Sequence, residues 1–179
     1  MAVTYFYFDF TDVEKQRHDN MIRSLITQLS LRCTGAPGAL AALFSSCMDG
    51  ERQPTSDALL TTLQQMIGEF KEVFVILDAL DECKERQELL EDINEIAGWK
   101  SEKLHILATS RREKDIEESL SLLVSDKRKV CFQDEPVNDD IRAYIQKRLQ
   151  TDQNLKRWRN KPEVQQEIET KLMDKADGM

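Results

Sequence analysis

Residues 73–82 read Val-Phe-Val-Ile-Leu-Asp-Ala-Leu-Asp-Glu. An apolar run without polar alternation is typical of a strand that is covered on both faces, as in a parallel sheet. The strand ends at Asp78, and Asp81 and Glu82 follow it closely. Ligands of open α/β folds bind at the carboxyl edge of the sheet, where these acids would lie. Acids also favour helix N-termini, which accounts for Asp81 and Glu82 but not for Asp78. The segment therefore predicts a Mg²⁺ site at this edge.

Residues 104–112 repeat the arrangement with the opposite charge. The apolar run Leu-His-Ile-Leu-Ala is followed by Thr109, Ser110 and two arginines. An arginine at the end of a strand can bind a phosphate with its planar fork, although a solvated loop arginine is the commoner case. Acids after one strand and arginines after the next favour a shared site. His105 stands inside the apolar run and is expected in the core.

Short apolar runs alternate with amphipathic stretches outward from these two segments. Further strands are expected at Val3–Phe8 and Val130–Phe132. Alternation of strands and helices indicates an α/β fold with a mainly parallel sheet. The apolar spacing and the capping residues predict helices at His18–Arg32, Ala39–Cys47, Thr55 or Ser56 to Gly68, Glu82–Ala97, Lys114–Leu123, Asp139–Leu149 and Pro162–Lys175.

Composition narrows the class of protein. A chain of 179 residues with a net charge of −8 does not favour a nucleic-acid partner, because phosphate backbones are held by surplus Lys and Arg. No apolar run approaches the ~20 residues that cross a bilayer, and no secretory leader opens the sequence, so a cytoplasmic location without a membrane partner is expected. The cysteines form no C-x-x-C pair and predict reduced thiols rather than a zinc site.

Together the two strand-end segments resemble a known family. VFVILDALDE is similar to the Walker B strand of the NACHT-domain signal-transduction P-loop NTPases, which belong to the STAND class. LHILATSRR is similar to the sensor-1 strand of that family. The opening VTYFYFDF, with Arg23-Ser24-Leu25 and Gln28-Leu29 in the next helix, resembles the second strand and helix of the fungal NLR-like members. Nephrocystin-like N-terminal NTPases belong to the same group.

The resemblance implies a fold and a set of roles. The fold would be an incomplete P-loop NTPase of the ASCE type, a three-layer α/β sandwich, with a partial core over residues 1–150 and the start of a helical subdomain over 151–179. Asp78 would hold Mg²⁺, and Asp81 or Glu82 would orient the attacking water. At the end of the next strand, Arg111 would sense the γ-phosphate of the nucleotide, ATP or ADP, with the flanking Thr109 and Ser110.

The phosphate-binding loop of that family is missing. None of the six glycines fits the pattern G-x-x-x-x-G-K-[ST], whose backbone and lysine cradle the phosphates. The resemblance places the P-loop strand between Leu104–Ala108 and Val130–Phe132, so a gap is expected there. We therefore expect a fragment of a nucleotide-dependent signalling ATPase that does not hydrolyse nucleotide alone. Other NACHT protomers or repeat-domain proteins are its implied partners.

Two alternatives stay open from the sequence. The chain can be a non-catalytic interaction module that retains the NTPase fold. It can also be a metal-dependent phosphoesterase or nuclease that uses Asp78, Asp81 and Glu82, although two-metal sites usually gather acids from several elements.

Overall fold

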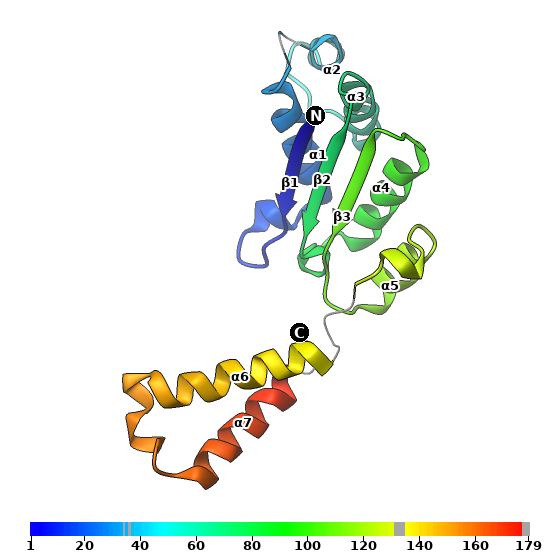
Figure 1. Cartoon of the computed structure of the whole chain (residues 1–179). Coiled ribbons are helices and arrows are strands. Elements are labelled where there is room, and N and C mark those ends of the chain that lie inside the picture. The colour runs from blue at the N-terminus through cyan, green and yellow to red at the C-terminus, as the bar shows by residue number, and fades with distance from the viewer. Residues whose placement is uncertain (34, 36, 131–134, 177–179) are drawn as a thin grey trace. The chain divides into compact units, whose positions relative to one another are not determined.

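The computed structural model describes residues 1–33, 35, 37–130 and 135–176 (Figure 1). Its contacts divide the chain into two packed units, Met1–Leu123 and Val124–Met179. The boundary after residue 150, which rests on the family resemblance, stays a prediction.

The first unit is built on a three-stranded parallel sheet. Its strands are β1 (Ala2–Tyr7), β2 (Val73–Asp78) and β3 (Leu104–Ala108), in the order β1-β2-β3. The expected parallel α/β arrangement of these three strands is confirmed. In register, Phe6 lies beside Leu77, and Leu77 lies beside Ala108, so the three strands end at one edge. The strand expected at Val130–Phe132 lies partly outside the described residues, and the expected gap beside it stays a prediction.

The helices of the first unit follow the apolar spacing of the sequence. Thr55 caps α3, since its side-chain oxygen accepts a hydrogen bond from Ala58 N at 3.3 Å. The helix after β2 begins four residues later than Glu82, because the short 3-10 helix η2 (Leu80–Glu82) and an extended Cys83 intervene. The remaining elements are η1 (Val13–Gln16), α1 (His18–Ser30), α2 (Gly38–Ser46), α3 (Ser56–Gly68), α4 (Arg86–Gly98) and α5 (Lys114–Ser121).

Only one face of the sheet is covered by helices among the described residues. Figure 1 shows α1, α3 and α4 on the same side of the strands. Side chains of that face, such as Thr4, Val75 and Leu77, are buried. The other face exposes a continuous apolar and aromatic surface, here called the open sheet face: Val3, Tyr5, Tyr7, Phe74, Ile76, His105 and Leu107.

Two expectations about this sheet are therefore wrong. The run Val73–Leu77 was expected to be covered on both faces, but Phe74 is 36% exposed. His105 was expected in the core, but it is exposed and stacks on Phe74 with ring centroids 4.6 Å apart. An apolar run in the sequence predicts that its side chains can be buried. It does not predict whether anything packs on each face of the strand.

The second unit is a helical hairpin. It contains η3 (Asp126–Arg128), α6 (Glu135–Thr151), η4 (Gln153–Trp158) and α7 (Pro162–Ala176). Among its described side chains, Ile145 and Leu149 are apolar and buried. Arg142 Nε lies 3.2 Å from Glu169 Oε1 and joins α6 to α7. In neither unit do the described residues form a helix long and apolar enough to cross a membrane.

Candidate functional site

The ends of β2 and β3 are joined by direct contacts. The Thr109 hydroxyl donates a short hydrogen bond to Asp78 Oδ1 and accepts one from Ala79 N at 3.0 Å. Thr109 N also donates to Leu77 O at 2.9 Å, and Leu80 N donates to Thr109 O at 3.0 Å. The backbone after β3 thus follows the backbone after β2, and the predicted neighbours Asp78 and Thr109 lie together.

Asp81 fixes the loop that follows β3. Its Oδ1 accepts from Arg111 N at 3.0 Å and from the Ser110 hydroxyl at 3.3 Å. Arg111 Nε lies 3.6 Å from Asp81 Oδ2. The Asp81 side chain is only 9% exposed, whereas that of Arg111 is 59% exposed. The carboxylate is therefore committed to holding this loop, and the guanidinium keeps access to solvent.

Glu82 is held from the other side, by the segment that follows β1. Phe10 N donates to Glu82 Oε2 at 2.9 Å. Gln16 supports Phe10, because its Nε2 donates to the carbonyl oxygens of Asp9 at 3.2 Å and Phe10 at 2.6 Å. Gln16 is 3% exposed, and its Oε1 has no hydrogen-bond partner among the described residues. The segment that follows β1 therefore also contributes to the site.

Phe10 and Gln16 line the candidate site, and the sequence alone did not predict this. Their contacts join positions more than sixty residues apart, which no local pattern reveals. The available signal was an acid, Asp9, two residues after the end of β1 at the same sheet edge. Asp9 serves its own loop: the hydroxyl and the amide of Thr11 donate to it and hold the pKa of its carboxyl below the ordinary value.

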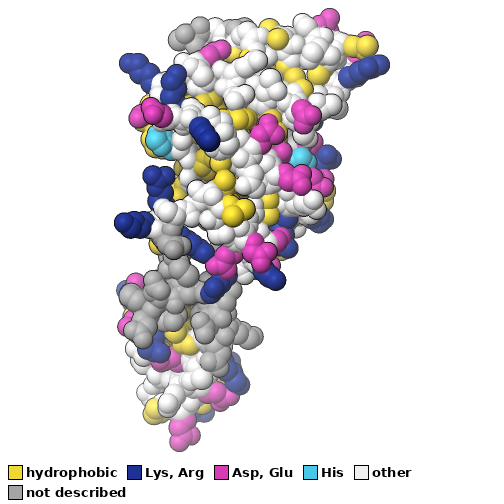
Figure 2. All heavy atoms as spheres, turned by 90° about the vertical axis from the view of Figure 1, so that its right-hand side faces the viewer, with side chains coloured by type: hydrophobic (Ala, Val, Ile, Leu, Met, Phe, Trp, Pro, Cys, Tyr) yellow, Lys and Arg dark blue, Asp and Glu magenta, His cyan; other side chains and the backbone are white. Residues whose placement is uncertain are grey.

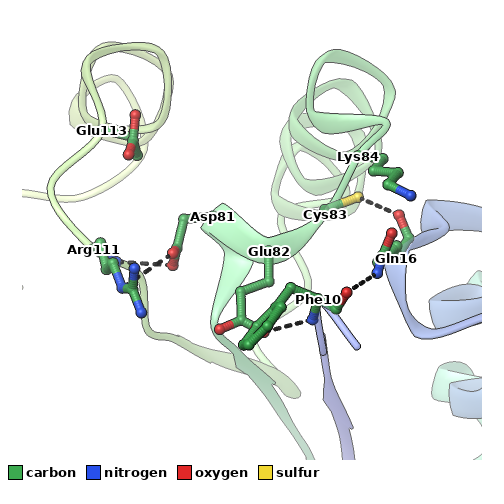
Figure 3. Close-up of a pocket in the computed structure, with 8 residues that line it drawn as sticks. All are labelled: Phe10, Gln16, Asp81, Glu82, Cys83, Lys84, Arg111 and Glu113. Carbon is green, nitrogen blue, oxygen red and sulfur yellow. Dashed lines mark hydrogen bonds and ion pairs between the residues drawn. The ribbon is translucent and has the colours of Figure 1, made fainter. Parts of the chain in front are cut away.

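These contacts surround a pocket of about 500 Å³ (Figure 3). Figure 3 shows Arg111 and Asp81 paired on one side of it, and Gln16 and Lys84 on the other side of Glu82. Burial raises the pKa of the Cys83 thiol to about 11, so Cys83 stays protonated and is no nucleophile at neutral pH. The lining residues are Phe10, Gln16, Asp81, Glu82, Cys83, Lys84, Arg111 and Glu113.

The chain turns sharply between Asp78 and Asp81. Ala79 has φ 58° and ψ 54°, the left-handed region that L-residues with a Cβ disfavour. The turn brings both carboxylates to the end of β3, where each contacts a different residue. A small residue at this position keeps the steric cost low, and strained backbone of this kind often marks functional sites.

The donor set suits a Mg²⁺ ion that is shared with a phosphate ligand. The described residues form no group of three His, Cys, Asp or Glu side chains that could hold a metal ion together. Mg²⁺ usually takes one or two carboxylates and completes its shell with water and substrate phosphates. Asp78 and the hydroxyls of Thr109 and Ser110 are oxygen donors of this kind at the sheet edge.

One comparison with known proteins gives a match. The family model described as "Nephrocystin 3, N-terminal" matches residues 1–111. The matched region contains β1, β2 and β3 and every residue of the predicted site, from Asp78 to Arg111. No curated protein and no solved structure matches the chain.

Proposed function

The chain belongs to the nephrocystin 3 N-terminal family, and from this premise we propose that it is the Mg²⁺- and phosphate-sensing part of a NACHT-type signalling NTPase. The observation that carries the proposal is the set of contacts between the ends of β2 and β3. Asp78 contacts Thr109, and Asp81 contacts Ser110 and Arg111. Carboxylates, hydroxyls and an arginine thus lie together at the sheet edge where open α/β folds bind their ligands, and this supports the proposal.

Within this proposal the side chains have separate roles. Asp78 would hold Mg²⁺ with the help of a neighbouring hydroxyl, and the ion would neutralise phosphate charge when it is bound. Arg111 is exposed and would contact the γ-phosphate. Asp81 is engaged by the Ser110–Arg111 loop, so its role is to position Arg111. That leaves Glu82, which lines the pocket, to orient the attacking water.

The phosphate cradle would come from a P-loop strand that is not part of residues 1–179. It would pair with the outer edge of β3, and further helices would pack on the open sheet face. Two features support this three-layer arrangement. The sheet is parallel, and parallel sheets are normally covered by helices on both faces. The open sheet face is also apolar, and large exposed apolar patches usually mark interaction surfaces. We expect no hydrolysis by the chain alone, a cytoplasmic location, and other NACHT protomers or repeat-domain proteins as partners.

A second candidate function is a non-catalytic interaction module. One observation favours it: each of the three acids already has a partner within the protein. Thr109 bonds to Asp78, Arg111 to Asp81, and the Phe10 amide to Glu82. Such contacts can serve to rigidify the sheet edge without any ligand.

Thermal unfolding with Mg²⁺ and ADP or ATP separates the two candidates. A ligand that binds only the native state raises the free energy of unfolding, by roughly 2.7 kcal/mol at 100 times its dissociation constant. The NTPase proposal expects a rise in the unfolding midpoint that needs Mg²⁺ and disappears in Asp78→Asn. A shift that survives Asp78→Asn contradicts the proposed site. A cooperative transition that nucleotide leaves unchanged favours the interaction module.

A further inference from the structure

The second unit carries a dense group of cations that the proposed function does not use. Residues 156–161 read Lys-Arg-Trp-Arg-Asn-Lys and lie at the end of η4 and before α7. We call them the basic turn. Such a concentration of positive charge is unusual in a chain whose net charge is −8.

Two of these cations each lie over the ring of Trp158. The Arg157 guanidinium lies 4.7 Å from the centroid of the Trp158 ring, and Lys161 Nζ lies 5.4 Å from it. Neither has an acidic partner among the described residues. Asp152, five residues before Arg157, is paired with Arg148 at 2.9 Å. Glu163, two residues after Lys161, forms no ion pair with either cation within the part of the chain that the structure describes. The two charges are therefore available to a ligand, and the ring fixes where they stand.

The backbone of the basic turn is fixed by hydrogen bonds. Gln165 Nε2 donates to the carbonyl oxygens of Trp158 at 2.9 Å and Arg159 at 2.7 Å. Lys161 N donates to Trp158 O at 3.0 Å. Arg159 Nη2 donates to Asp152 O at 3.2 Å, while its buried Nε has no hydrogen-bond partner among the described residues. A turn held in this way presents its cations at little entropic cost on binding.

The surroundings favour a compact anion over an extended one. Glu163 and Glu167 follow on α7, and Asp139 and Asp140 stand near the start of α6. A long polyanion that ran along either helix would meet these acids, whereas a small anion contacts the turn alone. Trp158 is half-buried with cations over its ring, so it offers little surface for stacking a nucleobase.

We propose that the basic turn binds a compact anion that carries several phosphate groups. The anion can be free in solution or the headgroup of a lipid, because the same guanidinium and ammonium groups would recognise both. This inference rests on the second unit and is independent of the proposed nucleotide site.

Tryptophan fluorescence gives a direct test, because the chain has only two tryptophans. In Trp99→Phe the remaining Trp158 reports on the two cations over its ring. We expect inositol hexakisphosphate to change its emission saturably, and to bind the unmodified chain in calorimetry. The double variant Arg157→Gln/Lys161→Gln should lose about tenfold or more in affinity, because charge-assisted bonds are removed. The matched control Lys71→Gln/Lys114→Gln removes two exposed cations from the first unit and should bind as the parent does.

Further probes identify the source of the phosphate groups. Binding to vesicles that carry phosphoinositides, but not to vesicles of neutral lipid, supports the lipid source; binding of the free anion alone supports the soluble source. The proposal is overturned if calorimetry detects no binding, or if Arg157→Gln/Lys161→Gln binds as tightly as the control pair. It is also overturned if a polyglutamate peptide or a single-stranded oligonucleotide binds as tightly as the compact anion.

Discussion

Ala79 shows at the scale of one residue how the sheet edge is built. Its left-handed backbone turns the chain between the acid that ends β2 and the acid that holds the loop after β3. The three acids then have three different partners: a hydroxyl, an arginine loop and the backbone of Phe10. The site is therefore a set of fixed contacts rather than a loose cluster of negative charge.

The conformation of Ala79 can be tested by substitution. A left-handed conformation costs an L-residue about 1–2 kcal/mol, and glycine avoids most of that cost. Ala79→Gly should therefore leave the free energy of unfolding unchanged or raise it by up to about 1 kcal/mol, whereas Ala79→Val should lower it. Denaturant unfolding measures both. The control is Ala97→Gly in α4, which should destabilise by about 1 kcal/mol; equal losses at both positions would contradict the left-handed turn.

Single side chains tie elements together in the first unit. Gln28 of α1 bonds to the edge strand β1: its Nε2 donates to Tyr5 O at 2.7 Å, and its Oε1 accepts from Tyr5 N at 3.1 Å. His18, at the start of α1, lies with Nδ1 2.6 Å from Asp92 Oδ2 in α4. The first contact closes part of a strand edge, and the second joins two helices that cover the sheet.

Gln28 is expected to protect the outer edge of β1. Gln28→Ala removes both hydrogen bonds and should cost about 1–2 kcal/mol of unfolding free energy. It should also speed hydrogen exchange of the Tyr5 amide. Gln87→Ala is the matched control, because the Gln87 side chain bonds only to Glu91 on the same helix among the described residues. Unchanged exchange at Tyr5 would show that Gln28 does not close this edge.

Asp92 should make stability depend on pH. Burial raises the pKa of its carboxyl above the ordinary value of 3.8, and the hydrogen bond from His18 offsets part of the rise. The folded chain then holds this proton more tightly than the unfolded chain. The resulting stabilisation is full below pH 3.8 and is lost as the pH rises through the raised pKa.

Asp92→Asn removes this titration. The unfolding free energy of the parent minus that of the variant should therefore fall as the pH rises above 3.8, measured by urea unfolding at several pH values. Asn94→Ala is the control, because it changes a polar side chain of the same helix without removing a titratable group. The unfolding free energy of the parent minus that of Asn94→Ala should not depend on pH. A difference for Asp92→Asn that rises with pH would contradict the raised pKa.

Local pattern was enough to predict most elements, and it failed where contacts are long-range. Apolar runs placed β2 and β3, and the Thr55 cap placed α3. Because parallel strands end at the same edge of a sheet, the sequence also predicted that Asp78, Asp81 and Thr109–Arg111 lie close together, as their contacts show. The late start of α4 depends on the turn at Ala79, and the site roles of Phe10 and Gln16 depend on contacts between distant segments. Neither is encoded in periodicity.

At the scale of the whole molecule, the chain consists of two packed units with different surfaces. The connected hydrophobic core of the described residues lies within Met1–Leu123. The open sheet face belongs to this first unit, and the basic turn to the second. Figure 2 shows acidic side chains gathered on the face that carries α4 and α5. Under the two proposals above, each unit would bind its own ligand.

The two units should unfold independently. A chain that ends at Leu123 keeps the whole core, so it should unfold cooperatively with nearly the same urea midpoint as the first unit within the intact chain. Few apolar side chains are buried in the described part of the second unit, so we expect it to melt first in the intact chain. Circular dichroism follows the helices of both, and Trp99 reports on the first unit. Loss of cooperative unfolding after truncation would show that the first unit needs the second.

We propose that the ends of β2 and β3 form the Mg²⁺ half of a nucleotide site. Mn²⁺ can replace Mg²⁺ and broadens NMR signals of nearby nuclei, so it locates the ion directly. With ADP present, we predict that the amide signals of Asp78–Glu82 and Thr109–Arg111 broaden first, that excess Mg²⁺ reverses the effect, and that Asp78→Asn abolishes it. Broadening that is centred elsewhere, or that is the same in Asp78→Asn, would contradict the account.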